Sequence, residues 1–226
     1  MKPHERIIFA LDVPDIIEAQ RLKDLLEGCV GAFKVGLELF ISGGPNAVST
    51  RHPTMLDLKL HDIPETVERA VLRAGDMGVK FLTLHVQQRE TMRRAVKAAE
   101  KSGVQLLGVT VLTSMTDTDL KDFCVEGDTL TAVLTRAKLA AEEGITGFVT
   151  SPREVGLLRK AYPEAVLVTP GIRPAGSDMG DQKRTGTPAQ AVQDGADYIV
   201  VGRPIRDADN PVAMAGLIAA EIEITT

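Results

Sequence analysis

Two acidic residues and a lysine lie within six positions of one another, and this spacing could support proton-transfer chemistry. They are Asp57, Lys59 and Asp62. Side chains alternate along a β-strand, so a strand over residues 54–59 would direct Asp57 and Lys59 to the same face. Charges are costly to bury unless each has a partner. An isolated Asp-x-Lys pair is usually a solvated surface ion pair, so the rest of the chain must decide between the two interpretations.

Length and composition set the class of protein. The chain has 226 residues, of which 44% are hydrophobic, and this is enough for one large core. Charged residues make up 25% and the net charge is −5, which gives no sign of a general nucleic-acid-binding surface. No apolar run reaches the length of a signal-peptide core or a transmembrane span, so we expect a cytoplasmic protein. Cys29 and Cys124 show no metal-binding spacing, so we expect reduced thiols.

Apolar runs typical of buried parallel strands alternate with amphipathic segments along the chain. The predicted strands cover residues 6–13, 31–36, 54–59, 80–85, 105–112, 145–150, 165–169 and 197–202. The predicted helices cover residues 15–27, 64–77, 89–101, 129–143, 152–161, 189–194 and 211–222, with 45–48 as part of one more. Eight units of roughly 28 residues predict an α/β fold, a (β/α)8 TIM barrel that forms a single domain over residues 1–226. The same alternation permits a doubly wound open sheet, but no G-x-G-x-x-G follows the first strand.

Ionisable residues recur where the predicted strands end. In a barrel of this kind, the active site lies at the C-terminal ends of the strands. Those ends carry, in chain order, Asp12, Lys34, Asp57 with Lys59, His85, Thr113 and Gly202 with Arg203. The alternation of acid and base over the first three strand ends favours one shared site over separate surface charges. His85 could be a base or a ligand, but a lone histidine at a strand end is more often simply packed or hydrogen-bonded.

Glycine and arginine at the last two strand ends predict a phosphate site. Gly171 and Arg173 follow the seventh strand, and Gly202 and Arg203 follow the eighth. These two loops commonly hold a phosphate in this fold, because glycine allows the backbone to approach and arginine supplies charge and forked donors. The loop over residues 170–188 is long for a compact domain, which predicts a lid over the substrate.

The residues alone therefore predict a phosphorylated small-molecule substrate bound opposite an acid–lysine–acid array. No nucleophile–base pair and no metal-binding cluster is recognisable in the sequence. The array fits proton transfer at carbon, because a lysine can stabilise a carbanion electrostatically and then protonate it.

Several segments in order resemble the orotidine 5′-phosphate decarboxylase family, and the resemblance covers essentially the whole chain. They are FKVG at 33–36, DLKLHDIP at 57–64, VTVLTSM at 109–115, TPGIRP at 169–174, GDQKR at 180–184 and VGRPI at 201–205. The D-x-K-x-x-D pattern alone would not be specific, since other decarboxylases and aldolases of the same superfamily share it. The ordered set of segments is specific.

The resemblance implies a reaction that needs neither a cofactor nor a metal and that converts orotidine 5′-phosphate into uridine 5′-phosphate and carbon dioxide. It implies that Lys59 protonates the carbon vacated by the carboxylate and that Asp57 lies beside that carboxylate. It also implies that Asp62 polarises Lys59 and reaches the site of the other subunit of a homodimer. The full set of implied substrate-binding residues is Asp12, Lys34, Asp57, Lys59, Asp62, Ile63, Thr66, Thr113, Arg173, Gln182, Gly202 and Arg203.

Within this set, the resemblance implies different contacts for different residues. Asp12 and Lys34 would bind the ribose hydroxyls, and Gln182 would contact the phosphate from the predicted lid. The chain departs from the usual family pattern in three places. Glu65 stands where the family usually has asparagine, residues 86–89 replace a small glycine-containing stretch, and residues 185–186 replace apolar residues.

Two alternatives remain open at this point. The first is a metal-dependent sugar-phosphate decarboxylase or synthase of the same superfamily, which would share D-x-K-x-x-D. Residues 171–174 and 180–182 argue against it. The second is a non-catalytic nucleotide-binding paralogue, against which the complete set of Asp57, Lys59 and Asp62 argues.

Overall fold

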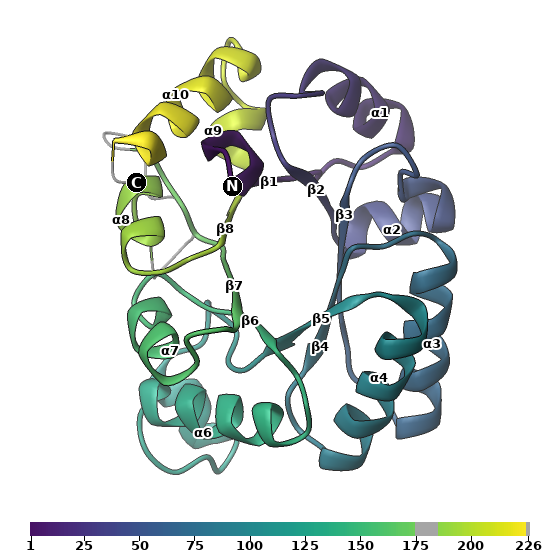
Figure 1. The fold of residues 1–226 in the computed structure, drawn as a ribbon, viewed down its shortest axis with the longest axis vertical. Helices are drawn as coiled ribbons and strands as arrows, with labels where there is room; N and C mark the ends of the chain where they lie inside the picture. The colour runs from purple at the N-terminus through teal and green to yellow at the C-terminus, as the bar shows by residue number, and fades with distance from the viewer. Residues whose placement is uncertain (175–184, 225–226) are drawn as a thin grey trace.

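Eight parallel strands close into a barrel at the centre of the computed structural model, which describes residues 1–174 and 185–224 (Figure 1). The strands are β1 Ile7–Ala10, β2 Ala32–Val35, β3 Thr54–Leu60, β4 Phe81–His85, β5 Gln105–Val109, β6 Gly147–Val149, β7 Val166–Thr169 and β8 Tyr198–Val201. Neighbours in sequence are neighbours in the sheet, and β8 pairs with β1. The predicted (β/α)8 barrel is confirmed, and the doubly wound open sheet is excluded.

Helices surround the barrel on the outside (Figure 1). They are α1 Ile16–Leu25, α2 Leu37–Gly43, α3 Pro64–Asp76, α4 Arg89–Ser102, α5 Asp117–Asp122, α6 Thr129–Glu142, α7 Val155–Ala161, α8 Pro188–Gln193, α9 Arg203–Arg206 and α10 Pro211–Glu223, with 3-10 turns at η1 Pro3–Arg6 and η2 Gly44–Ala47. The helix predicted around residues 45–48 was misplaced, because α2 precedes it and η2 covers most of it. The sequence reading also missed the short helices α5 and α9. No helix in the described part of the chain is long and apolar enough to cross a membrane.

Capping residues fix the ends of the helices that follow the strands. The side chain of Asp15 accepts a hydrogen bond from the Glu18 N–H at 2.9 Å, which starts α1 as its sequence predicts. Pro64 begins α3, where its missing N–H is not needed. Gly103 ends α4 in the left-handed conformation, with φ +73°. These residues set where the three helices start or end, and the parallel pairing of the strands puts their C-terminal ends at one rim.

The core has two layers, because the strands are covered on both faces. Ile7 and Phe9 of β1 belong to the large core between the strands and the helices, whereas Ile8 and Ala10 belong to a smaller core inside the barrel. The other members of the inner core are Ala32, Met55, Phe81, Leu107, Val168 and Val200. Side chains of a strand alternate between its two faces, so the inward residues of β1, β2 and β3 are set by this register.

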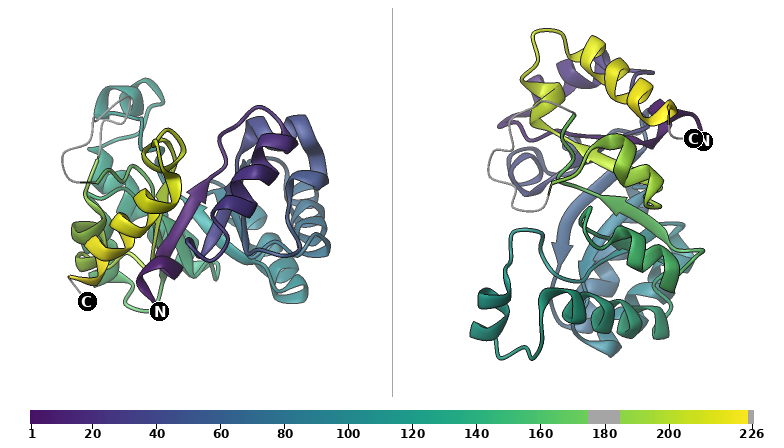
Figure 2. Two further views of the ribbon diagram at one scale, coloured as in Figure 1. Left: turned by 90° about the horizontal axis from the view of Figure 1, so that it is seen from above. Right: turned by 90° about the vertical axis from the view of Figure 1, so that its left-hand side faces the viewer.

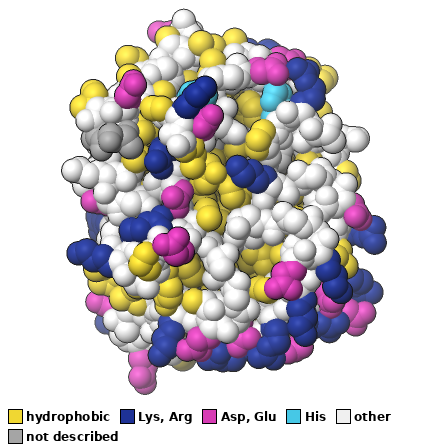
Figure 3. All heavy atoms as spheres, in the orientation of Figure 1, with side chains coloured by type: hydrophobic (Ala, Val, Ile, Leu, Met, Phe, Trp, Pro, Cys, Tyr) yellow, Lys and Arg dark blue, Asp and Glu magenta, His cyan; other side chains and the backbone are white. Residues whose placement is uncertain are grey.

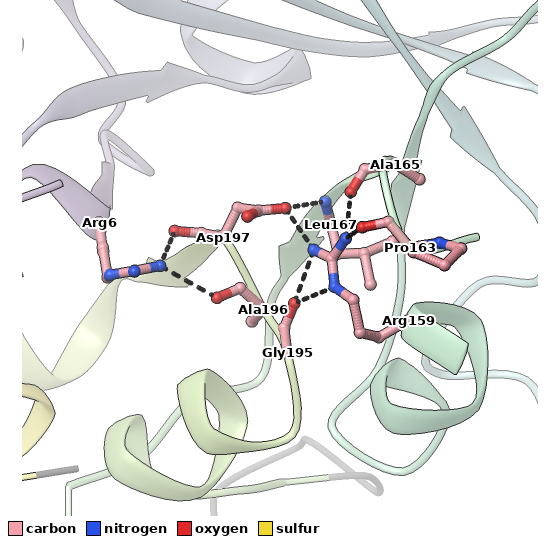
Figure 4. Close-up of polar contacts among 8 residues, drawn as sticks. All are labelled: Arg6, Arg159, Pro163, Ala165, Leu167, Gly195, Ala196 and Asp197. Atoms are coloured by element: carbon pink, nitrogen blue, oxygen red, sulfur yellow. Dashed lines mark hydrogen bonds and ion pairs between the residues drawn. The ribbon is translucent and has the colours of Figure 1, made fainter. Parts of the chain in front are cut away.

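A hydrogen-bonded network ties the starts of β7 and β8 together at the N-terminal end of the barrel (Figure 4). Arg159 of α7 donates to the Gly195 carbonyl at 2.8 Å and to the Asp197 carboxylate at 2.6 Å. The same carboxylate oxygen accepts the Leu167 N–H at 2.8 Å. Arg6 donates to the Asp197 carbonyl at 3.2 Å, which links η1 to this network. A Cβ on Gly195 would lie 2.7 Å from Arg159 Cγ, so the position requires glycine.

The N-terminus and the end of α10 lie on the side of the barrel where the strands begin (Figure 2). On the face drawn in Figure 3, basic and acidic side chains are interspersed around the rim, and hydrophobic side chains gather towards the middle. This mixture does not form a large field of one sign on that face. The concentrated charge described next lies at the C-terminal strand ends.

Candidate active site

A cavity of about 260 Å³ opens at the C-terminal ends of the strands. It is of the size and position that a small-molecule site in this fold would have. The structure brings eight of the twelve predicted substrate-binding residues together around it. These are Asp12, Lys34, Asp57, Lys59, Thr113, Arg173, Gly202 and Arg203.

The strand register explains why three charged side chains share this cavity. Each stands two positions after a residue of the inner core, and side chains two positions apart point to the same face. The charged residues are Asp12, Lys34 and Asp57, and their inner-core predecessors are Ala10, Ala32 and Met55. The inner core thus forms the floor of the cavity, and the charges extend from that floor towards its mouth.

The four ionisable groups form a chain in which acid and base alternate. Lys34 Nζ lies 2.9 Å from Asp12 Oδ1 and 3.8 Å from Asp57 Oδ2. Lys59 Nζ lies 2.8 Å from Asp57 Oδ1. The side chain of Asp57 is only 13% exposed and that of Lys34 only 12%, whereas that of Asp12 is 53% exposed. Asp57 is therefore the buried centre of the array, with one lysine on each side.

The charge of Asp57 is stabilised by its neighbours. Burial alone raises the pKa of this carboxyl, but the charges of Lys59 and Lys34 and the hydrogen bonds from Lys59 and Thr83 more than offset burial. The pKa of Asp57 consequently lies below its ordinary value. The array holds a carboxylate and two ammonium groups in contact, away from most of the solvent.

The strand that carries Asp57 and Lys59 is irregular at this point. Lys59 has φ +50°, a conformation that residues other than glycine rarely adopt. Between Leu56 and Leu60 the pairing of β3 with β4 shifts register. The strand predicted over residues 54–59 is confirmed as β3, but the regular alternation of side chains expected along it is interrupted at Lys59. The two side chains still meet, as the hydrogen bond between them shows.

The predicted phosphate-binding residues after β7 and β8 line the same cavity. Gly171 has φ +79°, which suits a glycine, and Arg173 follows it at the cavity wall. Gly202 leaves little room for a side chain, since a Cβ there would lie 3.3 Å from the Ala10 Cβ. Arg203 begins α9 and lines the cavity. Gln182, predicted to contact the phosphate, lies outside the described residues.

The second predicted acid lies apart from Lys59 of its own chain. Asp62 is exposed and accepts the Ile63 N–H at 2.6 Å. Asp62 and Ile63 line a different cavity, of about 390 Å³, together with His61 and His85. Ile63 is 64% exposed, although it is a large hydrophobic residue. Thr66, one turn into α3, is half-buried.

His85 is packed against His61, with 5.5 Å between the ring centres. Burial lowers the pKa of His85, and the nearby charges of His61 and Lys59 lower it further, which favours the neutral imidazole. His85 does not line the cavity that contains Asp57 and Lys59.

The three departures from the family pattern have local structural roles. Glu65 pairs with Arg69 one turn along α3, at 3.3 Å, and both side chains are exposed. Arg89 pairs with Glu142 at 2.8 Å and with Glu143 at 2.9 Å, which links α4 to α6. Gly186 pairs with Ile172, and a Cβ at Gly186 would lie 2.6 Å from the Pro152 Cβ. An apolar side chain would not fit at that position unless Pro152 moved.

Fold and cavity together define a (β/α)8-barrel protein with an alternating charge array at the C-terminal ends of its strands. Residues 5–218 match the family described as orotidine 5′-phosphate decarboxylase / HUMPS. The match spans almost the entire chain, and the chain belongs to this family.

Curated relatives are similar to this chain along nearly their whole lengths. The chain is 48% identical to an orotidine 5′-phosphate decarboxylase of Anaeromyxobacter dehalogenans, over 97% of this chain and 99% of that protein. It is 44% identical to the enzyme of that name from Desulfosudis oleivorans, over 98% and 94%. The crystal structure of an orotidine 5′-phosphate decarboxylase from Lactobacillus acidophilus superposes with a TM-score of 0.85 at 32% identity, over 96% of this chain and 98% of that one.

Sequence reasoning missed one polar residue that contacts the array. Thr83 lies in the middle of β4 and reads as an ordinary strand threonine among apolar neighbours. The one signal that could have found it was its polar hydroxyl on a strand that is otherwise buried.

Proposed function

We propose that the array of Asp57 and Lys59 performs the chemical step by which this chain decarboxylates orotidine 5′-phosphate to uridine 5′-phosphate in pyrimidine biosynthesis. One observation carries the assignment of these two residues. The Lys59 ammonium contacts the buried Asp57 carboxylate at 2.8 Å, in the cavity that also includes Arg173 and Arg203. A charged pair of this kind can act on a reacting carbon while arginines hold a distant anion.

In this mechanism the bond between the ring carbon and the carboxylate breaks, and its electron pair remains on the ring carbon. The Lys59 ammonium stabilises the developing carbanion and transfers a proton to it, so carbon dioxide leaves and the ring carbon gains hydrogen. Lys59 is then neutral and regains a proton from solvent. Asp57 lies beside the departing carboxylate and holds Lys59 Nζ through the 2.8 Å hydrogen bond between the two side chains.

The remaining residues of the cavity bind the substrate. Asp12 and Lys34 would bind ribose hydroxyls, a role supported by their 2.9 Å pair at the outer, more exposed end of the charge array. Arg173, Gly202 and Arg203, which line the same cavity, would bind the phosphate. Thr113 lines the same cavity and would lie near the base. Phosphate binding at a distance from the reacting carbon can supply free energy to the chemical step.

We further propose that the working unit is a homodimer in which Asp62, Ile63 and Thr66 complete the site of the partner subunit. Exposure of Asp62 and Ile63 at one edge of the rim supports this proposal. Mixing Lys59→Ala protein with Asp62→Ala protein tests it, because each heterodimer then contains one site with both residues intact. Recovery of turnover is expected, and its absence in a verified heterodimer would contradict a shared site.

The whole assignment is tested by following the absorbance of orotidine 5′-phosphate with purified protein and excess EDTA. We expect rapid loss of substrate absorbance and formation of uridine 5′-phosphate, because the proposed mechanism needs no cofactor and no metal. Turnover of a sugar phosphate that requires added Mg²⁺ would favour a metal-dependent sugar-phosphate decarboxylase or synthase of the same superfamily. Tight binding of uridine 5′-phosphate without turnover would favour a nucleotide-binding paralogue.

A further inference from the structure

The hydroxyl of Thr83 contacts both members of the charge pair. Thr83 is fully buried in β4. Its Oγ1 accepts the Lys59 backbone N–H at 2.9 Å and donates to Asp57 Oδ1 at 3.0 Å. A hydroxyl has one proton to donate and can accept at the same time, so one side chain satisfies both bonds.

The irregular pairing of β3 with β4 creates the place for this hydroxyl. Leu56 pairs with Leu82 and Leu60 pairs with Leu84, so three residues of β3 lie opposite Thr83 alone. Within this bulge Lys59 adopts φ +50°. Such a conformation persists only when surrounding contacts favour it, and bulges near active sites redirect side chains. The bond from the Lys59 N–H to Thr83 is a contact of this kind.

Thr83 also orients the carboxylate. Asp57 Oδ1 accepts hydrogen bonds from both Lys59 Nζ, at 2.8 Å, and Thr83 Oγ1. The other oxygen, Oδ2, lies 3.8 Å from Lys34 Nζ. With Oδ1 bonded from two directions, rotation of the carboxylate is restricted, and its two oxygens are assigned to two different lysines.

We infer that Thr83 is a positioning residue, whose single hydroxyl fixes the Lys59 backbone and the Asp57 carboxylate relative to each other. The inference rests on the proposed roles of Asp57 and Lys59. A loss of alignment at the reacting carbon lowers the rate of the chemical step far more than it lowers binding of the product, because the phosphate and ribose contacts remain.

The test compares three single variants by turnover, by affinity for uridine 5′-phosphate and by urea unfolding. Thr83→Val removes the hydroxyl and keeps the shape, and Thr83→Ser keeps the hydroxyl. Thr54→Val is the matched control, because Thr54 is also fully buried, at the opposite end of β3, and its hydroxyl donates to the His52 carbonyl at 3.2 Å. Should Thr83→Val fail to fold, Thr83→Ala replaces it, since alanine introduces no new bulk.

For Thr83→Val we expect kcat/KM to fall about 100-fold, the size of effect that a small misplacement of catalytic groups produces. The Kd for uridine 5′-phosphate should change by less than about threefold, because binding uses the distant contacts. Thr83→Ser should restore activity to within about threefold of the original chain, since the hydroxyl is kept. Thr54→Val should lose stability without losing activity per folded molecule.

Several results would overturn the inference. Normal turnover in Thr83→Val would do so, as would equal activity losses in Thr83→Val and Thr54→Val, because both would indicate that the hydroxyl serves stability alone. Lys59→Ala is measured in parallel to separate this failure from failure of the proposed roles. If Lys59→Ala is inactive and Thr83→Val is active, only the inference about Thr83 is wrong. If Lys59→Ala turns over normally, the role of Lys59 itself is wrong.

Discussion

The two ends of the barrel each pair a basic side chain with an aspartate, but the partners of those pairs differ. At the N-terminal end, Arg159 donates to Asp197 and also to backbone carbonyls such as that of Gly195. At the C-terminal end, Lys59 contacts Asp57 and borders a cavity of about 260 Å³. The first pair joins segments of the chain, and the second presents charge to a space where a ligand fits. The comparison shows that similar residues join chain segments at one rim and face a cavity at the other, where we propose that they do chemistry.

The difference between the two rims is tested most strongly by Lys59→Ala, for which we expect the largest effect on activity. Loss of the proton donor and of the charge that stabilises the carbanion should lower kcat/KM by about 10⁴-fold or more. Binding of uridine 5′-phosphate should stay within about tenfold, because the lost interaction matters mostly in the transition state. Steady-state kinetics and calorimetry of product binding measure the two quantities. Lys160→Ala, which changes an exposed lysine of α7, is the control, and near-normal turnover in Lys59→Ala would refute the mechanism.

Arg159→Ala should lower stability without lowering activity per folded molecule. It removes hydrogen bonds to the Gly195 carbonyl and leaves the Asp197 carboxylate without its arginine, so the free energy of unfolding should fall by about 2 kcal/mol. Activity per folded molecule should be unchanged. Arg73→Ala is the matched control, because Arg73 pairs with Asp76 in the open, with side chains 79% and 63% exposed, and should change stability by less than about 0.5 kcal/mol. Urea unfolding distinguishes the two, and equal effects would show that the network at the N-terminal end adds little.

The pH dependence of stability gives the smallest expected effect. Because the pKa of Asp57 is lower in the folded chain than in the unfolded chain, its carboxylate contributes stability at pH values above the unfolded pKa of about 4. That contribution is lost as the pH falls through the folded pKa. The difference in unfolding free energy between the original chain and Asp57→Asn should therefore be constant from about pH 7 to pH 5 and then change in favour of Asp57→Asn below about pH 4. A difference that stays constant throughout would mean that the pKa of Asp57 is not lowered.

Much of the fold follows from pattern, because buried parallel strands are continuous apolar runs and helices end at glycine or begin at a cap. The eight strands and the N-cap at Asp15 were predicted for this reason. The short helices α5 and α9 were missed, since four to six residues contain too little of the 3.6-residue period to be recognised. The helix α2 starts directly after Gly36, and its sequence shows no clear division into an apolar and a polar face. The position of this helix was therefore not predicted.

The site was predictable where it depends on strand register and not where it depends on irregular backbone. Asp12 and Lys34 meet in the cavity because alternation along regular strands puts them there. The left-handed conformation at Lys59 depends on pairing with a strand more than twenty residues away. Local sequence patterns do not predict such a pairing. The contact with Thr83 follows from that pairing and could therefore not be predicted from the sequence either.

The backbone at residue 59 places two opposed requirements on one position. Its φ of +50° suits glycine or asparagine, whereas the proposed chemistry requires an ammonium group. A descendant of this chain that no longer needed the reaction would be released from the second requirement alone. Replacement of Lys59 by glycine would then remove the conformational strain at this residue. This position is therefore expected to be among the first to be substituted. A glycine at the corresponding position of a related barrel would mark a lineage that has abandoned this chemistry.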